Sequence, residues 1–399
     1  MPVVFVHGVN NRAGPGYDHA VAARDALFKS VFLPAAGLSD TDVISPYWGD
    51  SGARFAFDLG CVPTGREGTI ELGPAGATSM SLLAAAAAAA TPEASQPGTV
   101  LLTLARRDFV AAVDLLYAAT AQDAAGAEPE LARFAAGLAP YALDHDQRPP
   151  DWLAQVTDDQ DFVVTLQREV RRAAPEPEPT GPPTVVLGIA DTLWERAKEG
   201  ADHLAHEVGS FLGKPAWNAV RELVVPTVPR FLGDVFVYLN EERDHSGMSG
   251  PIGTCVFEAL RKGASGRTPT DPLIVVGHSL GGAIAYDVLS SSRPDVQVDV
   301  FCTVGSQVGL LEEIKVLAAS DAAVTAATGR TVARPSAVSH WINVFDYNDV
   351  LSYKLEPVFS GVADFSYPSG DLLHAHGAYF NQPSFFRRLG IRVQEALRT

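Results

Sequence analysis

One serine of the chain lies in a pattern that could make it a nucleophile. Ser279 is the third residue of Gly277-His278-Ser279-Leu280-Gly281-Gly282, which fits G-x-S-x-G. The pattern follows the apolar run 272–276 and precedes an apolar segment, 281–290, so we predict a sharp turn from a strand into a helix. Such a turn exposes the serine hydroxyl at the carboxyl edge of a sheet, and its glycines leave room where a Cβ would collide. The pattern alone is weak, but in this context it indicates acyl transfer through the serine.

A serine nucleophile needs a histidine base and an acid that orients this base, and in this architecture both follow the serine in the chain. Two aspartates, Asp346 and Asp349, follow the apolar run 340–345. Two histidines, His374 and His376, come further along. Each position therefore has two candidates.

The same chemistry needs backbone N–H groups to bind the oxyanion of the tetrahedral intermediate. Leu280 would supply one N–H at the start of the predicted helix, where the helix dipole favours negative charge. A second donor is expected from the loop that follows the apolar run 2–6. There Gly8 would let the backbone bring the Val9 N–H close to the substrate.

The elements that would position these residues alternate between strands and helices. The sequence predicts strands at 2–6, 41–48, 272–276, 298–304 and 340–345, helices at 17–32, 252–262 and 281–290, and a strand or buried edge at 234–239. This alternation favours an α/β fold with a doubly wound, mostly parallel sheet.

A block of different composition interrupts this alternation, and we predict three parts: core 1–50, a large, mainly helical insertion 51–228, and core 229–399. Helices are expected at 101–120, 131–143 and 152–172, and the Pro-Glu stretch 175–179 is expected to be an extended linker. The seven alanines 84–90 suggest a helix or a surface segment. We further expect that parts of the insertion and of 211–239 form an apolar cap over Ser279.

Composition excludes several classes of function. The chain has 399 residues, of which 47% are hydrophobic, enough for a large core. Its formal charge of −17 repels nucleic-acid backbones, so no nucleic-acid partner is expected. Three scattered cysteines favour a reducing compartment, and with no signal peptide or long apolar segment we expect a cytoplasmic protein without a membrane span.

No cofactor or metal is expected either. His203 and His206 precede Glu207 in the order H-x-x-H-E, which matches neither zinc-binding pattern, and Gly14-Pro15-Gly16 is no phosphate-binding loop. His7 and His278 are interpreted as packing residues.

Over 1–50 and 231–380 the chain resembles serine hydrolases of the α/β-hydrolase fold, most closely lipase-like and esterase-like members. The resemblance implies Asp349 as the acid, in the segment from Asn343 to Val350, and His376 as the base, in His376-Gly377-Ala378-Tyr379. The proline that commonly precedes the valine is absent here, so Asp346 stays as an alternate acid. His374, two residues before His376, stays as an alternate base. His340 is disfavoured because it precedes its predicted strand.

We therefore expect a serine hydrolase that cleaves carboxylic esters, lipid esters among them, through an acyl-enzyme. Two alternatives are a peptidase or amidase with the same triad and a catalytically inactive protein that keeps the fold to bind a partner. The expected partners are a small-molecule or lipid ester and, through the insertion, a protein.

Overall fold

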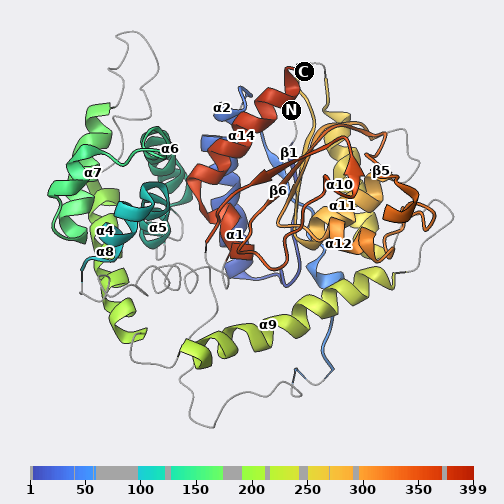
Figure 1. Cartoon of the computed structure of the whole chain (residues 1–399), viewed down its shortest axis with the longest axis horizontal. Coiled ribbons are helices and arrows are strands. Elements are labelled where there is room, and N and C mark those ends of the chain that lie inside the picture. Colours follow the sequence, from blue (N-terminus) through green and yellow to red (C-terminus); the bar gives the residue numbers. More distant parts are fainter. Residues whose placement is uncertain are drawn as a thin grey trace.

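A parallel sheet runs through the molecule (Figure 1). Its strands, in spatial order, are β2 (Val43–Ile44), β1 (Val3–Val6), β3 (Ile274–His278), β4 (Val298–Val304), β6 (Val338–Phe345) and β8 (Val362–Ser366). The computed structural model describes residues 3–39, 41–56, 58–59, 98–121, 127–173, 191–211, 216–241, 250–268, 270–290, 296–370 and 375–399, with backbone alone at 191, 203 and 205–227. Every strand pair of this sheet is parallel.

The order of the strands reverses at β1. The chain goes from β1 to β2 on one side, and β3, β4, β6 and β8 then follow on the other side. Val6, the last residue of β1, is in register with Gly277 of β3, so the loops after these two strands emerge side by side. In open parallel sheets, ligands bind at the carboxyl ends of strands where the order reverses.

Helices cover both faces of the sheet, as the alternation of buried residues in β1 requires. Val3 and Phe5 belong to one hydrophobic cluster, whereas Val4 and Val6 belong to the other. On the first face lie α1 (Pro15–Leu27), the π-helical turn η1 (Phe28–Phe32) and α14 (Pro383–Leu397); on the second lie α10 (Pro251–Ser265) and α11 (Leu280–Ser290) (Figure 1). The predicted α/β class with a parallel sheet is confirmed.

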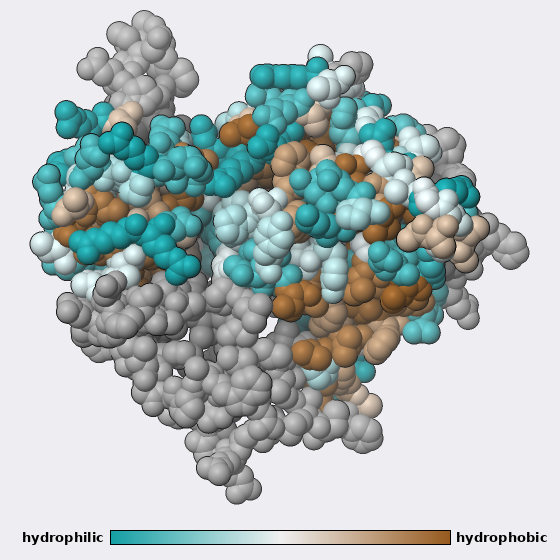
Figure 2. Space-filling view, in the orientation of Figure 1, coloured by the Kyte–Doolittle hydropathy of each residue, from teal (hydrophilic) through white to brown (hydrophobic). Residues whose placement is uncertain are grey.

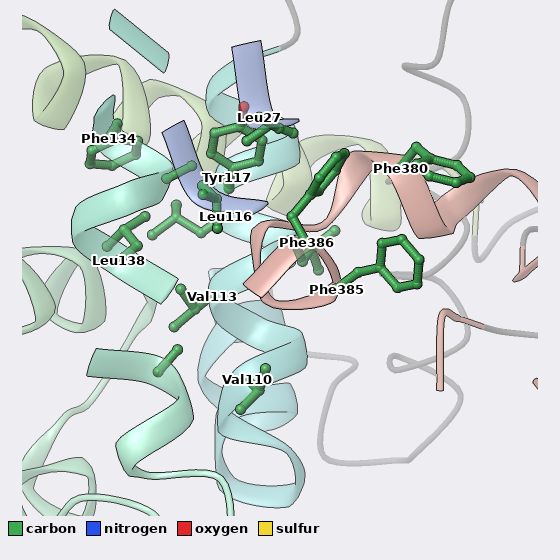
Figure 3. Close-up of a cluster of buried hydrophobic side chains, with 14 of the residues drawn as sticks. Leu27, Val110, Val113, Leu116, Tyr117, Phe134, Leu138, Phe380, Phe385 and Phe386 are labelled. Carbon is green, nitrogen blue, oxygen red and sulfur yellow. The ribbon is translucent and has the colours of Figure 1, made fainter. Parts of the chain in front are cut away.

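The described part of the predicted insertion, 51–228, is mainly helical, and five of its helices share one hydrophobic core with the first face of the sheet. They are α4 (Val100–Arg107), α5 (Phe109–Ala121), α6 (Glu128–Asp144), α7 (Asp159–Ala173) and α8 (Asp191–Phe211). Figure 3 shows Val113 and Leu116 of α5 and Leu138 of α6 in one cluster with Phe386 of α14. The expected helix 101–120 is two helices, because Asp108 is extended and its carboxylate accepts the Ala111 N–H at 2.9 Å, which caps α5.

The prediction of a strand or buried edge at 234–239 is wrong. These residues form the end of a long helix, α9 (Ala216–Leu239), which runs along the bottom of the view in Figure 1 and crosses the predicted boundary at 228. Asp234 and Tyr238, four residues apart, are both buried on one face of the helix. The opposite face exposes Val228, Leu232 and Phe236, and Figure 2 shows the apolar surface of this half of α9.

Most of the other predicted elements are confirmed, with changed ends. The strand at 41–48 shrinks to β2, the helix at 17–32 is α1 with η1, and the helix at 152–172 is η4 (Asp151–Gln155) followed by α7. The strand β8 and the helix α14 were not predicted from the sequence. The segments 84–90 and 175–179 lie outside the described residues. The remaining elements are α2 (Leu33–Ala35), η2 (Gly49–Ser51), α12 (Val308–Glu313), η6 (Ala326–Thr328), β5 (Val332–Ala333), β7 (Phe359–Ser360), α13 (Ala375–Ala378) and η7 (Tyr379–Asn381). A search of the described helices for a possible bilayer span finds none.

Candidate active site

Ser279 occupies a strained turn between β3 and α11. Its φ is 55°, in the left-handed region that a non-glycine residue rarely adopts. The turn is tight enough to demand glycine on both sides: a Cβ on Gly277 would lie 2.6 Å from Gly282 Cα, and one on Gly281 would lie 2.3 Å from the Val6 carbonyl oxygen. The Ser279 N–H donates to the Val304 carbonyl at 3.0 Å, which ties the turn to β4. The turn predicted from G-x-S-x-G is therefore present.

His376 lies between Ser279 and Asp349. Its Nε2 is 2.8 Å from Ser279 Oγ, and its Nδ1 is 2.9 Å and 3.1 Å from the two carboxylate oxygens of Asp349. A carboxylate only accepts hydrogen bonds, so its position assigns the proton to Nδ1 and leaves Nε2 to accept the Ser279 hydroxyl. This is the tautomer in which an imidazole can remove a proton from the serine.

Asp349 is buried and oriented by donors other than His376. Its side chain is 1% exposed. The Leu351 N–H donates to Oδ1 at 2.9 Å, and the Tyr379 hydroxyl donates to Oδ2 at 3.2 Å. With both oxygens hydrogen-bonded, the carboxylate is held in one orientation toward the imidazole. Tyr379, which closes the His-x-x-Tyr element, thus contacts the acid rather than the base.

Two of the alternative residues, Asp346 and His340, have other places in the structure. Asp346 is also buried, but its carboxylate accepts the Ser369 N–H at 2.6 Å, the Ser369 hydroxyl at 2.8 Å and the Asn348 N–H at 2.9 Å. His340 lies within β6, five residues before the strand ends and so roughly 16 Å from its carboxyl end. His374 lies outside the described residues. The described geometry joins Asp349 and His376 to Ser279.

The two expected oxyanion donors flank the serine. Leu280 begins α11, whose first backbone N–H groups have no acceptor within the helix. The loop after β1 approaches from the neighbouring strand: a Cβ on Gly8 would lie 2.6 Å from Ser279 Cβ and 3.1 Å from Ser279 Oγ. Only glycine permits this approach, which brings the backbone that precedes Val9 against the nucleophile.

His7 and His278 pack beside the site as neutral rings. Burial lowers the pKa of His7 to about 4; its ring stacks on Trp48 at 4.7 Å, and its Nδ1 lies 2.8 Å from the Gly8 carbonyl oxygen. Burial, together with the nearby His376, lowers the pKa of His278 to about 3. His278 Nε2 lies 2.8 Å from the carbonyl oxygen of His376, so the neutral ring donates to it and holds the backbone of the base.

Sequence analysis missed Gln307, which joins three parts of the site. Its Oε1 lies 3.4 Å from Ser279 Oγ, while its Nε2 donates to the carbonyl oxygens of Gly305 at 3.1 Å and Leu351 at 2.7 Å. The available signal was its position shortly after the buried run 298–304, at the same sheet edge as Ser279. Gln307 thereby links the nucleophile turn to the segment that carries Asp349.

Within the described ranges, no three His, Cys, Asp or Glu side chains are grouped so that they could hold a metal ion. Comparison of the chain with protein-family models, with curated proteins and with solved structures finds no match. The geometry of Ser279, His376 and Asp349 is therefore the basis for assigning a function.

Proposed function

We propose that the protein is a serine hydrolase that cleaves carboxylic esters through an acyl-enzyme, with Ser279, His376 and Asp349 as its triad. One observation carries the proposal: the hydrogen-bonded series from Ser279 Oγ through both nitrogens of His376 to the carboxylate of Asp349. This series begins at a strained serine at the carboxyl edge of a parallel sheet. Nucleophilic serine chemistry requires this combination of a serine, a base and an orienting acid, which supports the proposal.

In the first half of the reaction, His376 Nε2 takes the hydroxyl proton as Ser279 Oγ attacks the ester carbonyl carbon. Asp349 stabilises the imidazolium that results and keeps its Nδ1–H directed at the carboxylate. The tetrahedral intermediate then collapses, the C–O bond to the alcohol breaks, and His376 returns the proton to the leaving alkoxide. An acyl group remains on Ser279 Oγ.

In the second half, His376 removes a proton from water, and the hydroxide attacks the acyl carbonyl. The tetrahedral intermediate then collapses and releases the carboxylic acid, while His376 returns its proton to Ser279 Oγ and so restores the hydroxyl. In both halves the oxyanion is bound by the backbone N–H groups of Leu280 and Val9. One such donor lowers the barrier by roughly 2.7–4 kcal/mol. The steps balance without a metal or an organic cofactor.

The arrangement of the sheet supports an α/β-hydrolase assignment. The donor loop follows β1, the serine follows the adjacent β3, the acid follows β6, and the base follows β8. This is the chain order serine, acid, histidine that the fold uses. The apolar cap stays a prediction, since the side chains of 205–227 lie outside the described part of the chain.

Ester hydrolysis by purified protein tests the proposal. A series of p-nitrophenyl esters of increasing acyl length should be hydrolysed by the wild type, and Ser279→Ala should lower kcat by at least about 10³-fold because no covalent route remains. A parallel series of p-nitroanilides distinguishes an esterase from a peptidase or amidase. Equal rates for Ser279→Ala and the wild type would contradict the proposal.

A further inference from the structure

A carboxylate of helix α9 is buried against the loop that carries the second oxyanion donor. The side chain of Asp234 is 0% exposed, and each of its oxygens accepts two hydrogen bonds. Oδ2 accepts the Asn10 N–H at 2.7 Å and Arg12 Nη1 at 3.2 Å. Oδ1 accepts Arg12 Nη2 at 2.6 Å and the Ala53 N–H at 2.7 Å. One side chain thus joins α9 to the loops after β1 and after β2.

The contacts of the loop after β1 fix the direction of the Val9 N–H. The carbonyl oxygens of Gly8 and Val9 accept hydrogen bonds from Asn11 Nδ2 at 3.0 Å and 3.1 Å, and the Asn10 N–H is bound by Asp234. In a trans peptide the N–H points opposite to the C=O. The Val9 N–H therefore points away from the side on which the Gly8 carbonyl is bound.

The left-handed turn of the loop is fixed at both of its ends by Asp234. Asn10 has φ 61°, a conformation that Asn adopts more readily than most residues, and the contacts around it select this conformation. The Asn10 N–H donates to the Asp234 carboxylate. Arg12, two residues later, donates to both oxygens of the same carboxylate. Charge-assisted hydrogen bonds of this kind are about twice as strong as neutral ones.

We propose that Asp234 is a positioning residue that holds the Val9 N–H in place to bind the oxyanion, so that α9 sets the efficiency of the acyl-transfer step. The inference deepens the proposed function and rests on it. Asp234 touches neither Ser279 nor His376 in its hydrogen bonds and acts only through the loop 8–12. Its loss should therefore lower kcat while leaving substrate binding intact.

The chain offers a matched control on the same helix. Tyr238 lies one turn after Asp234, is fully buried, and donates its hydroxyl to Asp287 Oδ2 at 2.8 Å. Tyr238→Phe removes a hydrogen bond between α9 and α11 and leaves the hydrogen bonds of Asp234 to the loop 8–12 in place. A purely structural role of α9 predicts similar losses from Asp234→Asn and Tyr238→Phe, whereas positioning of Val9 predicts a loss from Asp234→Asn alone.

The test compares wild type, Asp234→Asn and Tyr238→Phe by steady-state hydrolysis of one p-nitrophenyl ester. The amide introduced by Asp234→Asn would present N–H donors to Arg12, so the loop should shift. We expect kcat to fall about 10–100-fold while KM stays within about threefold. A loss of this size is expected when an oxyanion donor is displaced by about 1 Å. A trifluoromethyl ketone, whose adduct with Ser279 carries an oxyanion, should lose affinity by the same factor. An alkyl p-nitrophenyl ether with the same chain length, which has no carbonyl and forms no oxyanion, should bind all three proteins equally.

Three results would overturn the inference: a folded Asp234→Asn protein with wild-type kcat, equal losses in Tyr238→Phe, or a rise in KM alone. If Asp234→Asn fails to fold, Arg12→Gln, at a partly exposed position, replaces it, with an expected kcat loss of about 3–10-fold at constant KM. An unchanged kcat in that variant is likewise contradictory. Wild-type protein that neither hydrolyses esters nor reacts at Ser279 would instead refute the proposed function, and this inference with it.

Discussion

At the scale of single residues, two buried aspartates of the same loop have different partners. Asp346 and Asp349 both follow β6, and each residue as a whole, backbone included, is 4% exposed. The oxygens of Asp346 are taken by the Ser369 N–H and hydroxyl and by the Asn348 N–H, so this carboxylate joins the end of β6 to the chain after β8. Asp349 keeps both oxygens within 3.1 Å of His376 Nδ1. Asp346 therefore stabilises the backbone beside the site, whereas Asp349 orients the base, His376.

Isosteric substitution separates these roles. Asp349→Asn should lower kcat by about 10³–10⁴-fold because an amide favours the wrong imidazole tautomer. Asp346→Asn should instead lower the free energy of unfolding by about 1–3 kcal/mol, since a buried hydrogen-bonded group is lost, while kcat falls by less than about tenfold. Steady-state kinetics and urea denaturation of both variants give the comparison. The reverse pattern would make Asp346 the acid.

The nucleophile turn between β3 and α11 could be predicted from local sequence signals alone. Its glycines are required by atoms within the turn or on the adjoining strand, so the motif and the two flanking apolar runs predicted β3, Ser279 and α11. The choice between Asp346 and Asp349 could not be made this way, because both follow the same strand. It depends on Ser369, more than twenty residues downstream, which binds Asp346 and leaves Asp349 for His376.

Helix α9 shows the other limit of sequence analysis. The run Val235-Phe236-Val237-Tyr238-Leu239 is short and apolar, which is compatible with a buried strand and with a helix. The deciding contacts are distant: Arg12 binds Asp234 from 222 positions away, and Asp287 accepts the Tyr238 hydroxyl. The same distance explains why neither Asp234 nor Arg12 could be recognised as part of the site.

At the scale of the whole molecule, a buried polar network joins the insertion to the segment that carries the base. Asp114 of α5 accepts the Ser384 hydroxyl at 2.6 Å, and Ser384 Oγ lies 2.7 Å from the hydroxyl of Tyr367. The Tyr367 hydroxyl also donates to Gln382 Oε1 at 2.6 Å, and Gln382 Nε2 donates to the Ser369 carbonyl. The network thereby reaches the residue that binds Asp346.

The burial of Asp114 is expected to make stability depend on pH. Burial raises the pKa of Asp114 from 3.8 to about 7. Between about pH 4 and pH 7 the folded protein therefore keeps a proton that the unfolded chain releases, so this group's contribution to the free energy of unfolding falls as pH rises through that window. The whole loss is up to about 4 kcal/mol, and it is complete above about pH 7.

Asp114→Asn removes the titration and keeps the shape of the side chain. The variant should therefore match the wild type near pH 4 and exceed it in stability near pH 8, as measured by urea denaturation across roughly this range. Taking the difference between the two proteins cancels the titration of all other groups. A difference that stays constant from about pH 4.5 to about pH 8 would show that Asp114 does not titrate there.

Covalent labelling measures whether His376 activates Ser279. Wild-type protein treated with a fluorophosphonate should gain one phosphonyl group, located by peptide mass mapping at Ser279. The rate of labelling should fall by at least about 10²-fold in His376→Ala, because general-base catalysis of this kind contributes about 10²–10⁴-fold. Absence of label from folded wild-type protein, label on another residue, or an undiminished rate in His376→Ala would contradict the account.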